Sequence, residues 1–284
     1  MKTTNPESSL RVNTSIVWSE TIKNMKFLAA YPVIFVFWTI FPLFWFIPFV
    51  LQGQALVGTQ GPSELWKGLT GNAEVVPFII VGAILNGYVL NALYGVGESI
   101  REEAYQGTLD YVLASPCNKA YVLIGKALSG SISSTIYAII QFLVCVFLFG
   151  ITMTALVIMP IILVIILLIF GLYGIALMLA AVSLQLKQAH EVAHTLDYIF
   201  YVFAPVRYPL QALPFWAQVI GQVLPLTYAL VATRGLMFGS ESPEQIYLSI
   251  FLLAMIDMAA ILIGFYMFNW MEERTKKSGS ISHY

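Results

Sequence analysis

Long apolar runs separated by short polar segments form the dominant pattern along this chain. A helix needs about 20 mostly apolar residues to cross the hydrocarbon layer of a bilayer. Six runs approach or exceed this length, and the fifth is the shortest and most interrupted. They cover residues 27–52, 77–97, 121–150, 155–184, 195–213 and 246–270. The pattern predicts an all-α integral membrane protein with about six transmembrane helices.

The segment before the first run has a different pattern. Between Ser8 and Met25, apolar residues recur at roughly helical spacing among polar ones, and Trp18 suits the headgroup layer. This predicts an amphipathic helix on the cytoplasmic membrane surface, although a frayed polar tail fits the same letters. The expected organisation is an N-terminal helix over 1–26, a membrane domain over 27–270 and a cytoplasmic tail over 271–284.

Composition agrees with a membrane location and excludes several other classes. The 284 residues are 59% hydrophobic and 10% charged, whereas soluble domains carry about 25% charged residues. A net charge of -1 offers no basic excess for nucleic acid. Two cysteines, Cys117 and Cys145, are too few and too isolated for a disulfide framework or a zinc-binding motif.

The positions of lysine and arginine predict the orientation in the membrane. With a cytoplasmic N-terminus, 11 of the 14 lysines and arginines fall in segments on the cytoplasmic side. Cytoplasmic loops of membrane proteins carry such an excess. We therefore expect a multi-pass protein of the plasma or inner membrane, with both termini in the cytoplasm.

The longest polar interruption on that side, residues 98–120, encodes a helix of its own. Gly107 permits a turn and Thr108 is a suitable N-cap. Leu109, Val112 and Leu113 supply an apolar face, and Ser115-Pro116 ends this helix and starts the next. Such a helix between two spans can dock on a soluble partner, or it can rest on the bilayer surface.

This segment resembles the membrane subunits of ABC-2 type transporters, through the pattern E-x-x-R-E-E-x-x-x-G-T-L-x-x-x-L-A-S-P followed by Gly125 and Lys126. The resemblance implies that the loop between the second and third spans holds a coupling helix, which docks on an ATPase. The candidate coupling residues are Glu98, Arg101, Glu102, Gly107, Thr108, Leu109, Val112, Leu113, Ser115 and Pro116.

A proline-rich region, residues 205–240, precedes the last run. One straight helix cannot pass through its four prolines, and broken backbone survives at membrane depth only inside protein or beside water. Short, partly buried helices that dip back from the outer face are expected over 213–236, with an external loop as the alternative. The region resembles the same family. Its candidate residues are Pro209, Pro214, Trp216, Pro225, Tyr228 and Arg234.

The chain contains no G-x-x-x-x-G-K-[ST] sequence, so no P-loop is present to hold nucleotide phosphates. The resemblance therefore implies a transport subunit without catalytic residues or a cofactor of its own. ATP and Mg would be bound by two copies of a partner ATPase, and a second permease chain, identical or related, would complete the complex. An exporter of amphiphilic or lipid-like molecules is the expected function.

Two further features leave other functions open. His190-Glu191-Val192-Ala193-His194 matches H-E-x-x-H, and an intramembrane zinc protease would use Asp257 as a further ligand. A polar cytoplasmic connector explains the same residues without metal. Asp257 alone, near the middle of the last run, fits an ion-coupled secondary carrier, or a buried carboxyl that faces another helix.

Overall fold

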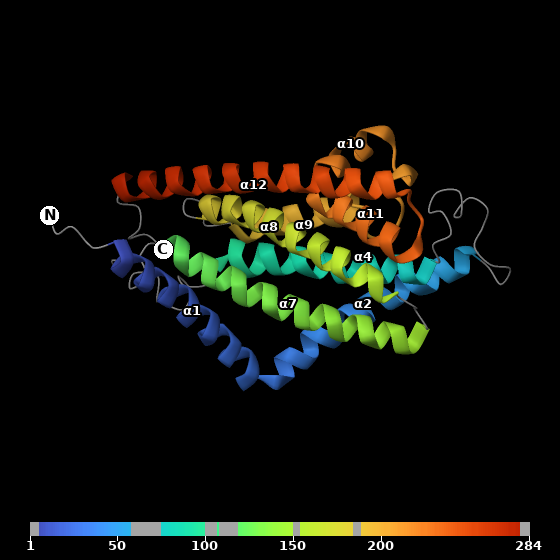
Figure 1. The fold of residues 1–284 in the computed structure, drawn as a ribbon, viewed down its shortest axis with the longest axis horizontal. Coiled ribbons are helices and arrows are strands. Elements are labelled where there is room, and N and C mark those ends of the chain that lie inside the picture. The colour runs from blue at the N-terminus through green and yellow to red at the C-terminus, as the bar shows by residue number, and fades with distance from the viewer. Residues whose placement is uncertain are drawn as a thin grey trace.

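The computed structural model describes residues 6–57, 75–99, 107, 119–149, 154–183 and 189–278, and every regular element within them is a helix. The long helices lie side by side along the longest axis of the molecule (Figure 1). The all-α membrane fold expected from the apolar runs is confirmed.

The first apolar run is broken rather than continuous. Helix α1 (Pro6–Ala30) and helix α2 (Pro32–Val57) meet at Tyr31, and their axes bend by 85°. Proline disfavours helical backbone in the residue before it and is well tolerated at the first position of a helix. The expectation of one span over 27–52 was therefore wrong at its start, because Pro32 begins a new helix.

The second run forms the centre of the bundle. Helix α4 (Val75–Leu90) continues into a π-helix, η1 (Asn91–Gly97), so that the span as a whole covers 23 residues. Most of its side chains are buried in the main hydrophobic core. Helix α4 packs against α2 and against α7 (Lys119–Phe149).

Small residues bring the fourth and sixth runs into close contact. A 3-10 turn (Ala155–Val157) leads into α8 (Ile158–Ser183), which packs along α12 (Pro243–Ser278). A Cβ atom added at Gly174 would lie 2.5 Å from the backbone carbon of Ala260, and one at Gly264 would lie 2.3 Å from the carbonyl oxygen of Gly174. Small residues are typical of helix contacts in membranes, where backbones approach closely.

The fifth run differs from its predicted bounds. Helix α9 (Ala189–Phe203) starts earlier and ends earlier than the expected span over 195–213. Residues 204–209 are irregular, and a 3-10 turn (Leu210–Ala212) follows. Four prolines between 205 and 225 explain the early end, because proline cannot donate the backbone hydrogen bonds that extend a helix.

Two short helices occupy the region where broken helices were expected. Helix α10 (Phe215–Val223) and helix α11 (Pro225–Phe238) meet at an angle of 90°. Helix α11 is buried among α4, α8 and α12. Partial burial was expected for the apolar residues of α10. Ala217 and Gly221 are buried, whereas Phe215 and Val223 are exposed, because α11 enters the bundle and α10 lies at its edge.

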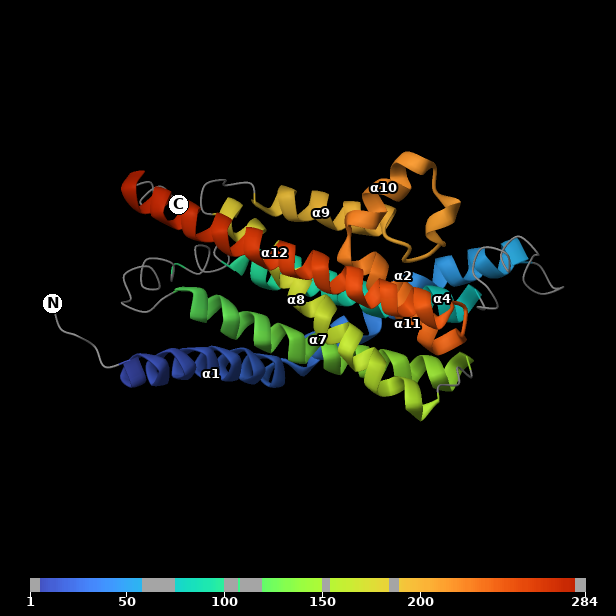
Figure 2. The ribbon, with the colours of Figure 1, turned by 45° about the horizontal axis from the view of Figure 1, so that its top comes forward.

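Four of the described helical segments are long and apolar enough to cross a membrane, and six pass if each bent pair counts as one span. The start of α1 and the end of α12 lie at one end of the bundle, together with the end of the second span and the start of α7 (Figures 1 and 2). This end is called the termini end below. Helices α10 and α11 mark the opposite end.

Candidate functional site

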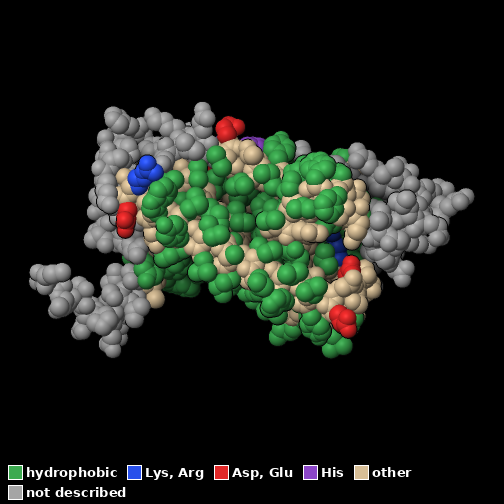
Figure 3. All heavy atoms as spheres, turned by 90° about the horizontal axis from the view of Figure 1, so that it is seen from above, with side chains coloured by type: hydrophobic (Ala, Val, Ile, Leu, Met, Phe, Trp, Pro, Cys, Tyr) green, Lys and Arg blue, Asp and Glu red, His purple; other side chains and the backbone are tan. Residues whose placement is uncertain are grey.

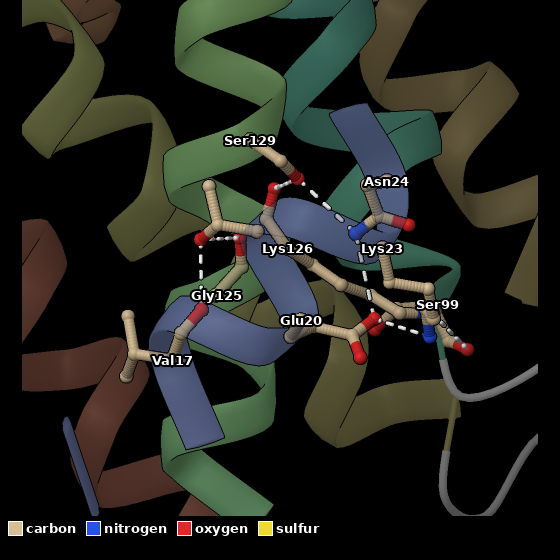
Figure 4. A network of polar contacts seen from close by, with 9 residues as sticks. Val17, Glu20, Lys23, Asn24, Ser99, Gly125, Lys126 and Ser129 are labelled. Carbon is tan, nitrogen blue, oxygen red and sulfur yellow. Dashed lines mark hydrogen bonds and ion pairs between the residues drawn. The ribbon is translucent and has the colours of Figure 1, made fainter. Parts of the chain in front are cut away.

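A cluster of polar contacts joins α1 to the start of α7 near the termini end (Figure 4). The hydroxyl of Thr21 donates to the carbonyl of Val17 at 2.8 Å and lies 3.3 Å from the carbonyl of Gly125. The amide of Asn24 donates to the hydroxyl of Ser129 at 3.2 Å. The contacts of Thr21 with Gly125 and of Asn24 with Ser129 join residues more than 100 positions apart and fix α1 along α7.

Close approach of the two helices depends on glycine. A Cβ atom added at Gly125 would lie 2.7 Å from the Cβ of Glu20 and 2.9 Å from the carbonyl oxygen of Val17. Both distances are far below van der Waals contact, so any larger residue would displace α1. Gly125 follows the pattern that resembles ABC-2 type transporters, and its role here is to allow α1 to pack on α7.

Lys126 connects the same cluster to the second span. Its side chain is 8% exposed, and its ammonium donates to the backbone carbonyl of Ser99 at 3.5 Å. The carbonyl of Lys126 in turn accepts a hydrogen bond from Ser129 at 2.9 Å. Residues on either side of the segment 100–118 are therefore held together, and α1 is fixed to the same point.

Most of the predicted coupling residues lie outside the described residues. Those outside are Arg101, Glu102, Thr108, Leu109, Val112, Leu113, Ser115 and Pro116. Gly107 lies in a turn with a φ of 69°, which glycine adopts without steric cost. Glu98, at the end of the second span, places its carboxylate 2.7 Å from Nδ1 of His190.

The two histidines of the H-E-x-x-H sequence face aromatic rings. The rings of His190 and His194 lie 5.1 Å apart, and each lies 5.9 Å from the ring of Tyr94. In the described part of the chain, no three His, Cys, Asp or Glu side chains are grouped so that they could hold a metal ion. Asp257, the further ligand expected for a zinc protease, has its carboxyl against Gly171 of α8.

Arg234 of α11 connects three segments at the opposite end. The side chain is 4% exposed, and its guanidinium donates to the carbonyls of Pro205, Val206 and Phe78. It also lies 3.4 Å above the ring of Phe78. A Cβ atom added at Gly82 would lie 1.9 Å from the carbonyl oxygen of Val206, so α4 and this irregular segment are in direct contact. Arg234 thus fixes α11 to α4 and to the backbone after α9.

The other candidates of the 205–240 region lie on the two short helices and in the backbone just before them. Pro209 precedes the 3-10 turn and Pro214 precedes α10, while Pro225 begins α11. The exposed ring of Trp216 meets Phe203 edge-on at 5.9 Å, and Tyr228 is half-buried against the main core. The structure therefore brings together both short helices, the end of α9 and α4.

Asp257 is 2% exposed, and neither carboxyl oxygen has a hydrogen-bond partner among the residues that the structure describes. A Cβ atom added at Gly171 would lie 1.7 Å from Oδ1 of Asp257. The carboxyl therefore fills space left by the missing side chain of Gly171. Its place is the contact between α8 and α12, as expected for a carboxyl that faces another helix.

Several residues that hold the site together were not singled out from the sequence. Thr21 and Asn24 carry the α1–α7 contact, and Tyr94 packs against both histidines. The hydroxyl of Tyr173 donates to the carbonyl of Ala127 at 2.6 Å. The only signal for these contacts was the abundance of small and hydroxylated residues early in the run 121–150, which is typical of close helix packing.

The model of the ABC-2 type transporter family matches residues 63–238, which is more than half of the chain. No curated protein matches the chain. The match covers the second to fifth apolar runs, the segment 98–120 and both short helices. Permeases of this family lack a nucleotide-binding site and generally pair with ATPase subunits. The chain belongs to the ABC-2 type transporter family and is a multi-pass membrane permease subunit.

Proposed function

We propose that this permease exports an amphiphilic or lipid-like molecule from the cytoplasm or the inner leaflet, driven by a separate ATPase. Two ATPase copies would bind ATP and Mg, and a second permease chain would complete the path. The contact between Lys126 and Ser99 carries the proposal, because it unites the two spans that flank the segment 100–118.

The mechanical step follows from that contact. A partner that moves the segment 100–118 would displace α7 and the end of η1 as one unit. Helix α1 would move with them, because Thr21 and Asn24 attach it to α7. A rigid element with two positions is a known means of transmitting such a change. The residues Leu109, Val112 and Leu113 would supply the apolar face that contacts the ATPase.

The proposed orientation places the termini end in the cytoplasm. The start of α1, the end of α12 and both sides of the segment 100–118 share that end (Figures 1 and 2). Eleven of the 14 lysines and arginines fall in segments assigned to this side. A cysteine placed at Ser280 in a variant with Cys117 and Cys145 replaced by serine should resist a membrane-impermeant maleimide in intact cells. Labelling without permeabilisation would overturn this orientation.

The function is tested by affinity purification of the tagged chain from native membranes, with identification of the proteins that remain bound. An ABC-type ATPase should co-purify, and its ATP hydrolysis should be lower when the permease carries Leu109→Asp. The matched control is Gln211→Asp, which adds the same charge at an exposed position of the opposite end. Absence of an ATPase, or an equal effect of both substitutions, would contradict the proposal.

A further inference from the structure

Helix α9 exposes a polar and aromatic face in a bundle whose outer surface is otherwise largely apolar. Its opposite face is buried, with Ala193 and Phe200 in the main core. The polar face is formed by residues at helical spacing, three or four apart. They are His190, His194, Asp197, Tyr198 and Tyr201, with Glu191 at the edge.

Aromatic rings form a continuous ladder along this face. His190 and His194 lie 5.1 Å apart, and His194 stacks on Tyr198 with a centroid distance of 5.8 Å. Tyr94 of η1 lies beside both histidines. The ring of Tyr198 is 61% exposed, so the ladder presents π surface outward instead of into the core.

The face also carries an excess of carboxylates. Glu98 lies against His190 at the start of the helix, Glu191 is exposed, and Asp197 is half-buried three residues after His194. Helix α9 contains no lysine or arginine. The nearest arginine along the chain is Arg207, which follows the helix and lies 3.4 Å above the ring of Tyr201.

Lipid is an unsuitable environment for such a face. Helix α9 has 15 residues and is therefore about 22 Å long, most of the roughly 30 Å thickness of the hydrocarbon layer. Ionisable residues at that depth face protein or water. Histidine and acidic side chains are visible at the edge of a surface covered mainly by hydrophobic ones (Figure 3). The polar face must therefore be covered by a second chain or line a hydrated path.

We propose that the polar face of α9, together with Tyr94 and Glu98, lines the transport path and binds a hydrophobic organic cation. This rests on the proposed function as a permease. Electron-rich ring faces attract cations, and the carboxylates of Asp197 and Glu191 neutralise the charge of the bound molecule. The rings accommodate its apolar groups, which a small hydrated ion would lack. An amphiphilic anion would meet the carboxylates of Glu98, Glu191 and Asp197 in the first part of the helix, away from Arg207 at its end.

The test measures saturable binding of two probes of equal size and opposite charge, tetraphenylphosphonium and tetraphenylborate. The full-length chain, with any ATPase that co-purifies, is reconstituted in lipid nanodiscs, and binding to empty nanodiscs is subtracted. Tetraphenylphosphonium should bind at least about tenfold more tightly than tetraphenylborate. Tyr198→Leu and Asp197→Asn should each weaken cation binding by about fivefold to tenfold.

Matched control variants test whether the site is specific. Tyr266→Leu removes an exposed tyrosine from α12, and Glu244→Gln removes an exposed carboxylate near the start of that helix. Neither should change cation binding. Equal affinity for the two probes, or equal effects of Tyr198→Leu and Tyr266→Leu, would overturn the inference.

The two proposals fail in different ways. If an ATPase co-purifies and the probes bind equally, the substrate class is wrong and the exporter function stands. If the cation binds as expected and no ATPase co-purifies, the cation site stands and ATP-driven export is overturned.

Discussion

The buried ammonium of Lys126 donates to the backbone carbonyl of Ser99, and this contact bridges the two spans on either side of the segment 100–118. The carbonyl belongs to the last described residue of the second span, and the lysine to the early turns of α7. Under the proposed coupling, a movement applied to the segment between them would reach both spans together. A lysine is suited to this place because its long side chain spans the gap while its stem packs against apolar neighbours.

Replacing Lys126 should separate ATP hydrolysis from transport. Lys126→Met preserves the length and apolar stem of the side chain but removes the donor to Ser99. We expect the complex with the ATPase to assemble and hydrolyse ATP, while substrate export per ATP falls several-fold. Transport and phosphate release measured on the same proteoliposomes would show this. Lys23→Met is the control, because Lys23 is solvent-exposed and its ion pair with Glu20 is worth less than about 1 kcal/mol. Equal ratios for the two variants would contradict the prediction.

Gly125→Ala should detach α1 from α7. The new Cβ atom would lie 2.7 Å from the Cβ of Glu20 and 2.9 Å from the Val17 carbonyl, so α1 must shift. Overpacking of this kind costs about 1–3 kcal/mol. We expect a lower melting temperature and faster proteolysis within α1. Gly87→Ala should be neutral or stabilising, because no atom lies within 4 Å of the added methyl group and alanine favours helix by about 1 kcal/mol.

Arg234→Lys should destabilise the protein despite the retained charge. The guanidinium donates hydrogen bonds to three backbone carbonyls and lies over the ring of Phe78. A lysine ammonium cannot reproduce that planar arrangement, and each lost bond to a charged group costs about 1.5–3 kcal/mol. Thermal unfolding in detergent should show a clear decrease in melting temperature. Arg274→Lys, on the exposed end of α12, should leave it unchanged; similar shifts for both would show that Arg234 acts only as a charge.

Gly171 and Asp257 should behave as a coupled pair. Gly171→Ala brings a methyl group to within 1.7 Å of Oδ1 of Asp257 and should be destabilising. Asp257→Ala removes that oxygen, so the double variant should recover most of the loss. A double-mutant cycle by chemical denaturation should give a coupling free energy of about 1–3 kcal/mol.

Gly174→Ala provides the control for this cycle. Its added Cβ would meet the backbone of Ala260 and Ile261 at 2.5 and 2.6 Å, and the side chain of Asp257 is not among these contacts. Asp257→Ala should therefore not rescue it. Rescue of both glycine variants, or of neither, would show that the close contact between Gly171 and Asp257 does not determine the packing of α8 and α12.

Local sequence features predicted much of the fold correctly. The apolar runs gave the positions of most helices, and Pro205, Pro209, Pro214 and Pro225 predicted the broken region before α12. The same reasoning placed the start of the first span too early, because the run of apolar letters continues across Tyr31 although Pro32 changes the direction of the chain. It predicted partial burial for the region of both short helices, but apolar composition alone does not show which of the two enters the bundle.

The sequence by itself determined that the chain is a helical membrane protein, because transfer of each run into lipid depends on local composition. Only the tertiary structure decided which side chains meet. Thr21 reaches Gly125 across 104 positions, Arg234 reaches Phe78 across 156, and α9 has its polar face on the outside of the bundle. Such contacts depend on how close helix backbones approach and which faces turn toward each other, and packing of the whole bundle sets both.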